Sequence, residues 1–436
     1  MEKKSNCQKT YFYSLLRVIA LLVVALLLPR FYFTETKIYP SLLSSEKRIS
    51  IKNNFKLGLE NISQDFLKQL GNGRLDYTVG IITNHTGIDQ EGKRNIDILL
   101  TKGLNIKQIF IPEDDFSAYK KGLDWDMVDH STQIPLCVLS SIDSLKKMKE
   151  YAFGNIDVIF LDIQDKGISP DSYLTTLLKT LQSAASQSKT VVVLDRPNLL
   201  GSTMEGIISD ARDGENIPIP LRHGMTIGEL ASYFNSYVVS QSARLYVVPM
   251  KQYTRSLFSN TMPAYHTSLL TNIDMYYGSS FLSVLGSVSP FDIGFDTDMA
   301  FNCLTLPESL HVPKQKWFEL RALLKNQGME TSWVRYYNSK KRMYYAGLRF
   351  LIPNVEHFST FNAIVTIITY FQQAGIKLTF SSEFERTFGG RKIKDFLDGK
   401  YTRYALEYDV NKGLKNFFNK AYKSFIYKPT PKIVLL

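Results

Sequence analysis

Four short apolar runs, rich in β-branched residues, dominate the first half of the chain. They cover residues 79–85, 106–113, 158–165 and 191–198, and each ends in a cluster of polar residues. Runs of this kind, separated by helix-length segments, are typical of buried parallel strands in βαβ units. Ligands of open parallel sheets sit outside the carboxyl ends of the strands. The pattern therefore predicts a parallel α/β sheet with a candidate site along one edge, although single polar residues there could serve only as helix caps or loop ties.

The helical periodicity between these runs supports the same fold. Residues 172–187 place leucines and alanines on one face at helical spacing. A second helix is expected to begin near Thr226, which with Glu229 forms a capping box, so Glu229 is explained structurally. A further strand is predicted over residues 245–250. Together these elements predict a Rossmann-like parallel-sheet domain over residues 57–250.

A smaller C-terminal α/β domain is predicted over residues 251–436. Its first part, residues 256–297, lacks strong periodicity and is expected to form loops over the site. Its regular elements are a strand, a helix and a helical, aromatic-rich tail, predicted over residues 345–352, 359–374 and 393–427. Two domains also suit a length of 436 residues, which exceeds one ordinary core.

The N-terminus has the composition of an export signal. Basic residues precede an uninterrupted apolar run over residues 18–28, but no small-residue cleavage site follows. Extended to residues 11–33, the segment is long enough to span a bilayer with aromatic residues at both ends. We expect a signal or anchor segment over residues 1–33, preferably uncleaved, and a linker over residues 34–56. The bulk of the chain is then extracytoplasmic, either membrane-anchored or secreted.

Charge and cysteine content exclude several classes of protein. The net charge is +11, but lysines and arginines are dispersed, so we expect no nucleic-acid partner and a surface that tolerates a membrane face or cell-wall polymer. Cys7, Cys137 and Cys303 make no metal spacing and no disulfide framework. Neither a GxGxxG string nor a P-loop is present. We therefore expect neither a metal nor a cofactor.

Glu113 is the first candidate for catalysis. It follows Pro112 at the end of an apolar run and would project from a rigid strand into the crevice. A carboxyl among apolar neighbours is suited to general acid catalysis, and the like charges of Asp114 and Asp115 act in the same direction. The alternative is an acidic surface loop.

Two other strand ends offer groups that bind sugars. Asn84 and His85 supply donors and acceptors for hydroxyls and amides, unless His85 merely bonds a neighbouring loop. Asp162, Gln164 and Asp165 follow the third run. The alternation of side chains along a strand places Asp162 and Gln164 on one side and Asp165 on the other, so they cannot all face one ligand.

The fourth strand end and a later histidine complete the set of candidate residues. Asp195, Arg196 and Asn198 surround a stiffening proline. Arg196 could form a bidentate pair with a carboxylate, either that of the substrate or that of Asp165. His223, just before the helix at Thr226, could contribute to an anion site at a helix N-terminus.

In their order, these blocks resemble the NamZ-type exo-β-N-acetylmuramidases, a glycoside hydrolase family acting on peptidoglycan fragments. The resemblance implies a Rossmann-like domain joined to a smaller α/β domain, release of terminal N-acetylmuramic acid from glycan chains in cell-wall recycling, and a catalytic glutamate at Glu113. It also places the retained Tyr173 among the substrate-binding residues. The strings that carry it are residues 80–87, 112–113, 160–167, 194–198, 204–206 and 223–231.

Departures from the family pattern leave two hypotheses open. Where the family reads Pro-Glu-His-Gly-Phe-Arg-Gly, residues 112–118 read Pro-Glu-Asp-Asp-Phe-Ser-Ala. The family's Arg-Phe-Tyr element is replaced by Ser-Pro-Asp at residues 169–171, and two later blocks are absent between residues 262 and 295. The first hypothesis is an exo-acting hydrolase of β-linked N-acetylmuramic acid or a related amino sugar. The second is a catalytically impaired relative that binds cell-wall glycan or a protein partner.

Overall fold

The computed structural model describes residues 55–112, 128–139, 153–208, 217–255, 273–295, 297–388 and 391–436. The predicted anchor, most of the linker and Glu113 lie outside these ranges. Within them, no helix has the length and apolar character needed to cross a membrane. Residues 53–436 form one compact unit by their contacts, and the division predicted at residue 250 stays a prediction.

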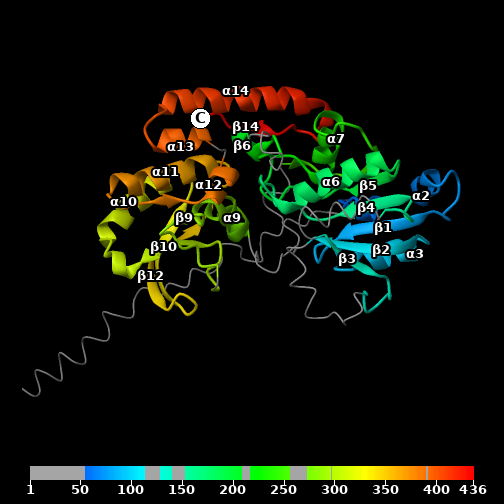
Figure 1. Cartoon of the computed structure of the whole chain (residues 1–436), viewed down its shortest axis with the longest axis horizontal. Helices are drawn as coiled ribbons and strands as arrows, with labels where there is room; N and C mark the ends of the chain where they lie inside the picture. The colour runs from blue at the N-terminus through cyan, green and yellow to red at the C-terminus, as the bar shows by residue number, and fades with distance from the viewer. Residues whose placement is uncertain are drawn as a thin grey trace, which may run out of the picture. The chain divides into compact units, whose positions relative to one another are not determined.

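A six-stranded parallel sheet forms the centre of the N-terminal half (Figure 1). Its strands follow the order β3-β2-β1-β4-β5-β8, which is the Rossmann order, and every neighbouring pair is parallel. The predicted parallel α/β fold is therefore confirmed. The strands are β1 (Thr78–Thr83), β2 (Asn105–Pro112), β3 (Leu136–Leu139), β4 (Val158–Asp162), β5 (Thr190–Leu194) and β8 (Arg244–Val248).

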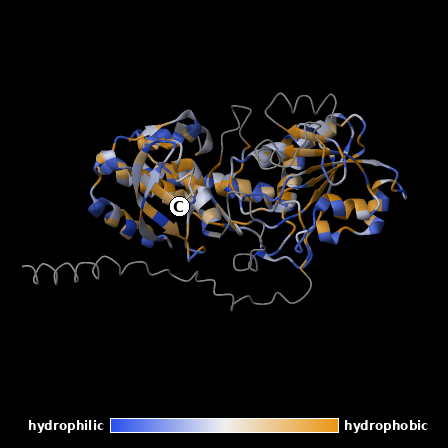
Figure 2. Ribbon diagram, turned by 90° about the horizontal axis from the view of Figure 1, so that it is seen from below, coloured by the Kyte–Doolittle hydropathy of each residue, from blue (hydrophilic) through white to orange (hydrophobic). Residues whose placement is uncertain are grey.

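Apolar side chains cover both faces of this sheet. Along β4, Ile159 and Leu161 belong to one buried cluster, whereas Val158 and Phe160 belong to another. Both faces are therefore packed, which explains why the runs are continuously apolar rather than alternating. Figure 2 shows the same concentration of apolar residues on the strands and the inner helix faces. The helices within the described residues of this half are α2 (Gln64–Leu70), α3 (Asn95–Thr101), α6 (Ser172–Ser186) and α7 (Ile227–Tyr237).

The C-terminal half is built around a three-stranded antiparallel sheet. Its order is β10-β12-β11, formed by Cys303–Pro307, Met343–Leu351 and Glu330–Asn338. The predicted strand, helix and helical tail are present. The helices of this half are α9 (Ile273–Leu285), α10 (Lys314–Lys325), α11 (Thr360–Gln373), α12 (Ser382–Thr387), α13 (Arg391–Leu397) and α14 (Arg403–Ala421), with short 3-10 turns at Glu308–Leu310 and Tyr422–Ser424.

The expectation of loops over residues 256–297 is wrong for its described part, because α9 occupies residues 273–285. Nearly every described side chain of α9 is buried, including Tyr276, Phe281 and Leu285. A helix that is buried all round has no polar face and therefore no amphipathic period to detect. A short antiparallel pair, β9 (Val288–Ser289) with β13 (Thr379–Phe380), follows it.

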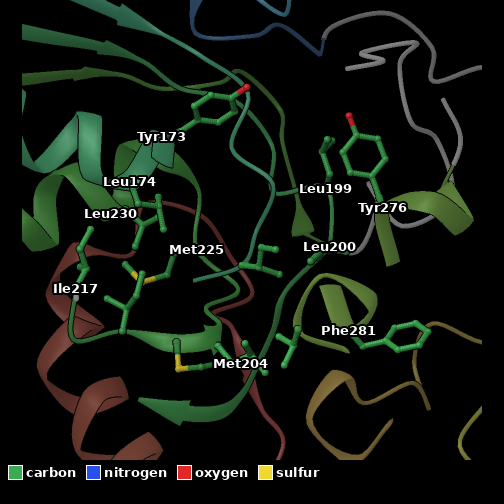
Figure 3. Close-up of a cluster of buried hydrophobic side chains, with 14 of the residues drawn as sticks. Tyr173, Leu174, Leu199, Leu200, Met204, Ile217, Met225, Leu230, Tyr276 and Phe281 are labelled. Carbon is green, nitrogen blue, oxygen red and sulfur yellow. The ribbon is translucent and has the colours of Figure 1, made fainter. Parts of the chain in front are cut away.

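A small third sheet ties the C-terminus to the N-terminal half. Strand β6 (Thr203–Ile208) pairs with β7 (Pro220–Arg222) and, in parallel, with β14 (Lys432–Ile433). Figure 3 shows the apolar side chains packed beside it, among them Met204, Met225 and Leu230. Sequence patterns missed all three strands; β7 and β14 are only three and two residues long, and β14 lies far along the chain from its partner β6.

Candidate active site

The carboxyl ends of β1, β4 and β5 meet at one edge of the parallel sheet. Thr83 and Asp162 are paired Cα positions at the last residues of β1 and β4, and β5 ends beside them at Leu194. The strand order reverses between β1 and β4, which is where α/β sheets of this type bind ligands. The polar residues that follow these three strands therefore gather at the topological switch point. Strand β2 ends at Pro112, the residue before Glu113.

Asp162 and Arg196 form a buried bidentate ion pair at this edge. Arg196 donates from Nε to Asp162 Oδ1 at 2.6 Å and from Nη2 to Oδ2 at 2.9 Å. Asn95, at the start of α3, donates to the same carboxylate at 2.8 Å, and Arg196 also reaches the carbonyl of Ile88 at 3.0 Å. Of the two partners considered for Arg196, the carboxylate of Asp165 gives way to that of Asp162, and pairing with a substrate carboxylate stays a prediction. The strand-end position of Asp162, directly opposite the loop after β5, is what brings the two charges together.

Asp195 is a second buried carboxylate, held at the N-terminus of α7. It accepts hydrogen bonds from Thr226 Oγ1 at 2.9 Å, from the Gly228 amide at 2.8 Å and from Tyr427 Oη at 2.6 Å. A Cβ on Gly228 would lie 2.7 Å from the Asp195 carboxyl carbon, so glycine permits this approach. Burial raises the pKa of Asp195 to about 7, and the charge of Glu229 acts in the same direction.

Glu229 caps α7 and also holds the C-terminal segment. The predicted capping box is confirmed, since Thr226 accepts from the Glu229 amide and Glu229 accepts from the Thr226 amide. The other carboxylate oxygen pairs with Arg255 and accepts from the amides of Ile426 and Tyr427 at 2.8 and 3.2 Å. Asp195 and Glu229 therefore both hold residues 426–427 of the C-terminal segment beside the end of β5 and the start of α7.

His223 lies beside a protein carboxylate. Its Nε2 lies 3.2 Å from Asp165 Oδ2, and its Nδ1 accepts from the Met225 amide at 3.2 Å. At the N-terminus of α7 the Gly228 amide donates to the carboxyl group of Asp195, and the contribution of His223 to an anion site stays a prediction.

Gln164 and Asp165 lie beyond the end of β4, so the alternation argument stops at Asp162. The Gln164 amide group donates to the carbonyls of Asp165 and Pro197 at 2.9 and 2.7 Å. Within the described residues, Gln164 Oε1, Asp165 Oδ1 and Ser169 Oγ are buried without a hydrogen-bond partner.

Three further predicted residues have local structural contacts. Asn84 accepts from the Thr86 amide at 2.9 Å, and Asn198 accepts from the Leu200 amide and donates to the Met225 carbonyl, both at 2.9 Å. Tyr173 is buried at the start of α6, with the Lys166 ammonium 4.9 Å from its ring centre. His85 is only partly buried at the same edge. Substrate binding by these residues stays a prediction.

Sequence reasoning missed the partners that complete these networks. Besides Asn95 and Tyr427, Arg222 pairs with Glu205 at 3.0 Å, and Glu205 accepts from the Thr360 amide at the start of α11. No local spacing connects residues so far apart along the chain. In the described part of the chain, no three His, Cys, Asp or Glu side chains are grouped to hold a metal ion.

Comparison with known proteins confirms the resemblance predicted from the sequence. Residues 79–270 match the family model for exo-beta-N-acetylmuramidase NamZ, N-terminal. The chain is 33% identical over 220 residues to the peptidoglycan beta-N-acetylmuramidase NamZ of Bacillus subtilis (strain 168), a match covering 49% of this chain and 51% of that protein. The chain thus matches about half the length of this curated relative.

Two crystal structures of DUF1343 family proteins from Bacteroides fragilis NCTC 9343 share the fold. The first has a TM-score of 0.72 at 22% identity and the second a TM-score of 0.63 at 21% identity. Each comparison covers 86% of this chain and 99% of the other. The common fold therefore extends well beyond the N-terminal region matched by sequence.

Proposed function

We propose that this NamZ-like chain is a glycoside hydrolase of cell-wall glycan, which removes terminal β-N-acetylmuramic acid or a related amino sugar from peptidoglycan fragments. The observation that carries the proposal is the NamZ match of residues 79–270, because this stretch contains every candidate site residue. The sheet supports it independently, since three polar strand ends lie together at the switch point.

Each group at this edge has a role suited to its environment. Glu113, directly after β2, would donate a proton to the leaving glycosidic oxygen, which is the task of the general acid in glycosidases. Asn84 and His85, after the neighbouring β1, would bind sugar hydroxyls and the amide. The buried Asp162–Arg196 pair would act as a rigid base beneath them, because Arg196 holds the carboxylate through two hydrogen bonds and also donates to the Ile88 carbonyl.

A second candidate function is glycan binding without hydrolysis. It is favoured by residues 114–118, Asp-Asp-Phe-Ser-Ala, which replace the His-Gly-Phe-Arg-Gly expected from the family after the glutamate. Arginine and histidine side chains are suited to the carboxylate and hydroxyls of muramic acid, so their replacement weakens the expected grip on this sugar.

Substitution of Glu113 separates the two functions. We expect Glu113→Gln to reduce turnover of a natural β-glycosidic linkage by roughly a hundredfold or more, the usual scale of general acid catalysis. A chromogenic muramic acid β-glycoside with a good leaving group should be affected less. Asp114→Asn removes the same charge from the adjacent residue and serves as the control. Full turnover by Glu113→Gln would remove Glu113 from the mechanism, and glycan binding by an inactive wild type would favour the second function.

The proposal includes export of the folded part with residues 1–33 as membrane anchor. Basic residues precede the apolar run, so the positive-inside rule leaves the first residues in the cytoplasm. A reporter fused after Leu436 should behave as an exported protein. Reporter activity confined to the cytoplasm would contradict both the anchor and access to cell-wall glycan.

A further inference from the structure

The hairpin formed by β11 and β12 carries an exposed aromatic surface. In the sequence, this hairpin lies more than a hundred residues after the last candidate residue of the active site. Tyr337 and Tyr344 are directly opposite each other in the antiparallel pair, and their ring centres lie 5.1 Å apart. Their side chains are 50% and 47% exposed. We call these two rings, with Arg335 and the turn residues 339–342, the hairpin surface. The strands belong to the yellow part of the chain in Figure 1.

The rings extend one face of the sheet beyond its helical cover. Trp333, Arg335 and Tyr337 alternate along β11 and therefore share a face. At the far end of this face, Trp333 packs against Trp317 of α10. Toward the turn the cover ends, and Arg335 and Tyr337 are exposed. Exposed large side chains held on paired strands form a rigid platform, which loses little conformational entropy when it binds a ligand.

The platform is held in place by its own contacts. The Arg335 guanidinium lies 4.2 Å from the centre of the Tyr344 ring and is fixed by Glu308 through bonds of 2.6 and 2.9 Å. The two tyrosine ring planes are inclined at 58°. The surface is therefore bent, unlike the parallel slot that sandwiches a planar base. A chair-shaped sugar ring presents apolar C–H faces and equatorial hydroxyls, which suit a bent tyrosine surface with polar edges.

Charge defines the second property of the ligand. Residues 331–349 contain five basic residues and no acidic residue. Three of these, Lys340, Lys341 and Arg342, lie consecutively in the exposed turn. Lys341 pairs with Asp292 at 2.5 Å, while Arg335 is balanced by Glu308. Arg342 has no acidic partner among the described residues, and this basic turn beside the two rings favours carboxylates spaced along a polymer.

We propose that the hairpin surface binds a carboxylated glycan strand, with Tyr337 and Tyr344 stacking on sugar rings and the basic turn contacting carboxylates. The site is separate from the strand ends of the parallel sheet. It would hold the protein on an anionic polysaccharide whether or not Glu113 is active. Membrane insertion is disfavoured because Met343 is the only large aliphatic side chain exposed at this end of the hairpin among the described residues.

Binding of the full chain to polygalacturonate tests the proposal, with dextran as the neutral polysaccharide. We expect binding to polygalacturonate that weakens with salt, and none to dextran. Tyr337→Ala combined with Tyr344→Ala should weaken binding by roughly tenfold or more, since both aromatic stacking contacts are lost. The double phenylalanine variant should retain binding. Lys340→Gln with Arg342→Gln should reduce both the affinity and its salt dependence.

Controls distinguish this surface from general basicity. Tyr404→Ala removes the most exposed large hydrophobic side chain of the described residues, at 79%, and Lys412→Gln with Lys415→Gln removes two basic charges from α14; neither should change binding. Circular dichroism checks that each variant is folded. Undiminished binding by the folded double alanine variant would overturn the proposal. So would absence of binding to polygalacturonate, or stronger binding to single-stranded DNA or to phosphatidylglycerol vesicles.

Discussion

Replacing Arg196 with methionine would leave the carboxylate of Asp162 buried without its countercharge. Asp162 is 0% exposed, and the arginine supplies two of its hydrogen bonds, at 2.6 and 2.9 Å. After the substitution only Asn95 would still donate to this carboxylate from another side chain among the described residues. Breaking a buried pair of this kind costs about 3–5 kcal/mol. We expect the loss of unfolding free energy for Arg196→Met to lie at the upper end of this range, because the hydrogen bond to the Ile88 carbonyl is lost as well.

A double-mutant cycle isolates the pair from the rest of the site. Asp162→Asn should lower the free energy of unfolding by a similar amount, because it leaves the guanidinium of Arg196 buried without a countercharge. The double variant should cost about 2 kcal/mol less than the sum of the two single variants, because neither charge is then left buried alone. The free energy of unfolding would be measured by urea titration followed by far-UV circular dichroism, and compared only where the slope with urea is unchanged.

A matched surface pair provides the reference for this experiment. Arg403 and Glu407 lie one turn apart on α14, 2.7 Å from nitrogen to oxygen, with the arginine side chain 69% exposed. Arg403→Met should therefore cost about 0.5 kcal/mol or less. A loss for Arg196→Met no larger than that of this control, or single effects at Asp162 and Arg196 that simply add, would show that the buried pair does not stabilise the fold as a unit.

The hydrogen bond between Asp195, after β5, and Tyr427 in the C-terminal segment gives two further predictions. Burial raises the pKa of Asp195 from 3.8 to about 7. Between pH 3.8 and about 7, the folded protein therefore keeps a proton on Asp195 that the unfolded chain has released. The free energy of unfolding should consequently fall as the pH rises from about 4 to 7. Asp195→Asn should remove that part of the slope in urea titrations across this range, and an unchanged slope would exclude Asp195 as the titrating group. Tyr427→Phe removes a hydroxyl that donates to Asp195 at 2.6 Å and accepts from the Met250 amide at 2.8 Å, and should cost about 1–3 kcal/mol of unfolding free energy. Tyr404→Phe, at an exposed position, should cost almost nothing, and equal losses in the two variants would show that the buried hydroxyl contributes nothing specific.

Features that depend on near neighbours could be predicted from the sequence alone. The strands β1, β4 and β5 were found because both faces of the sheet are buried, which makes each run apolar without interruption. The capping box of Thr226 and Glu229 was found because its partners are three residues apart. The gathering of polar strand ends at one edge also followed, since parallel strands present their carboxyl ends on the same side.

The tertiary structure alone decided what each polar residue binds. Arg196 pairs with Asp162, 34 residues away, and Tyr427 reaches Asp195 across 232 residues. Neither partner has a fixed spacing, because ion pairs and buried hydrogen bonds require closeness in space and leave no period in the chain. Helix α9 was hidden for a related reason: once every side of a helix is packed, polarity no longer alternates along it. The sequence thus determined where the sheet has its functional edge, whereas packing between distant segments determined which side chains at that edge are bound up within the protein.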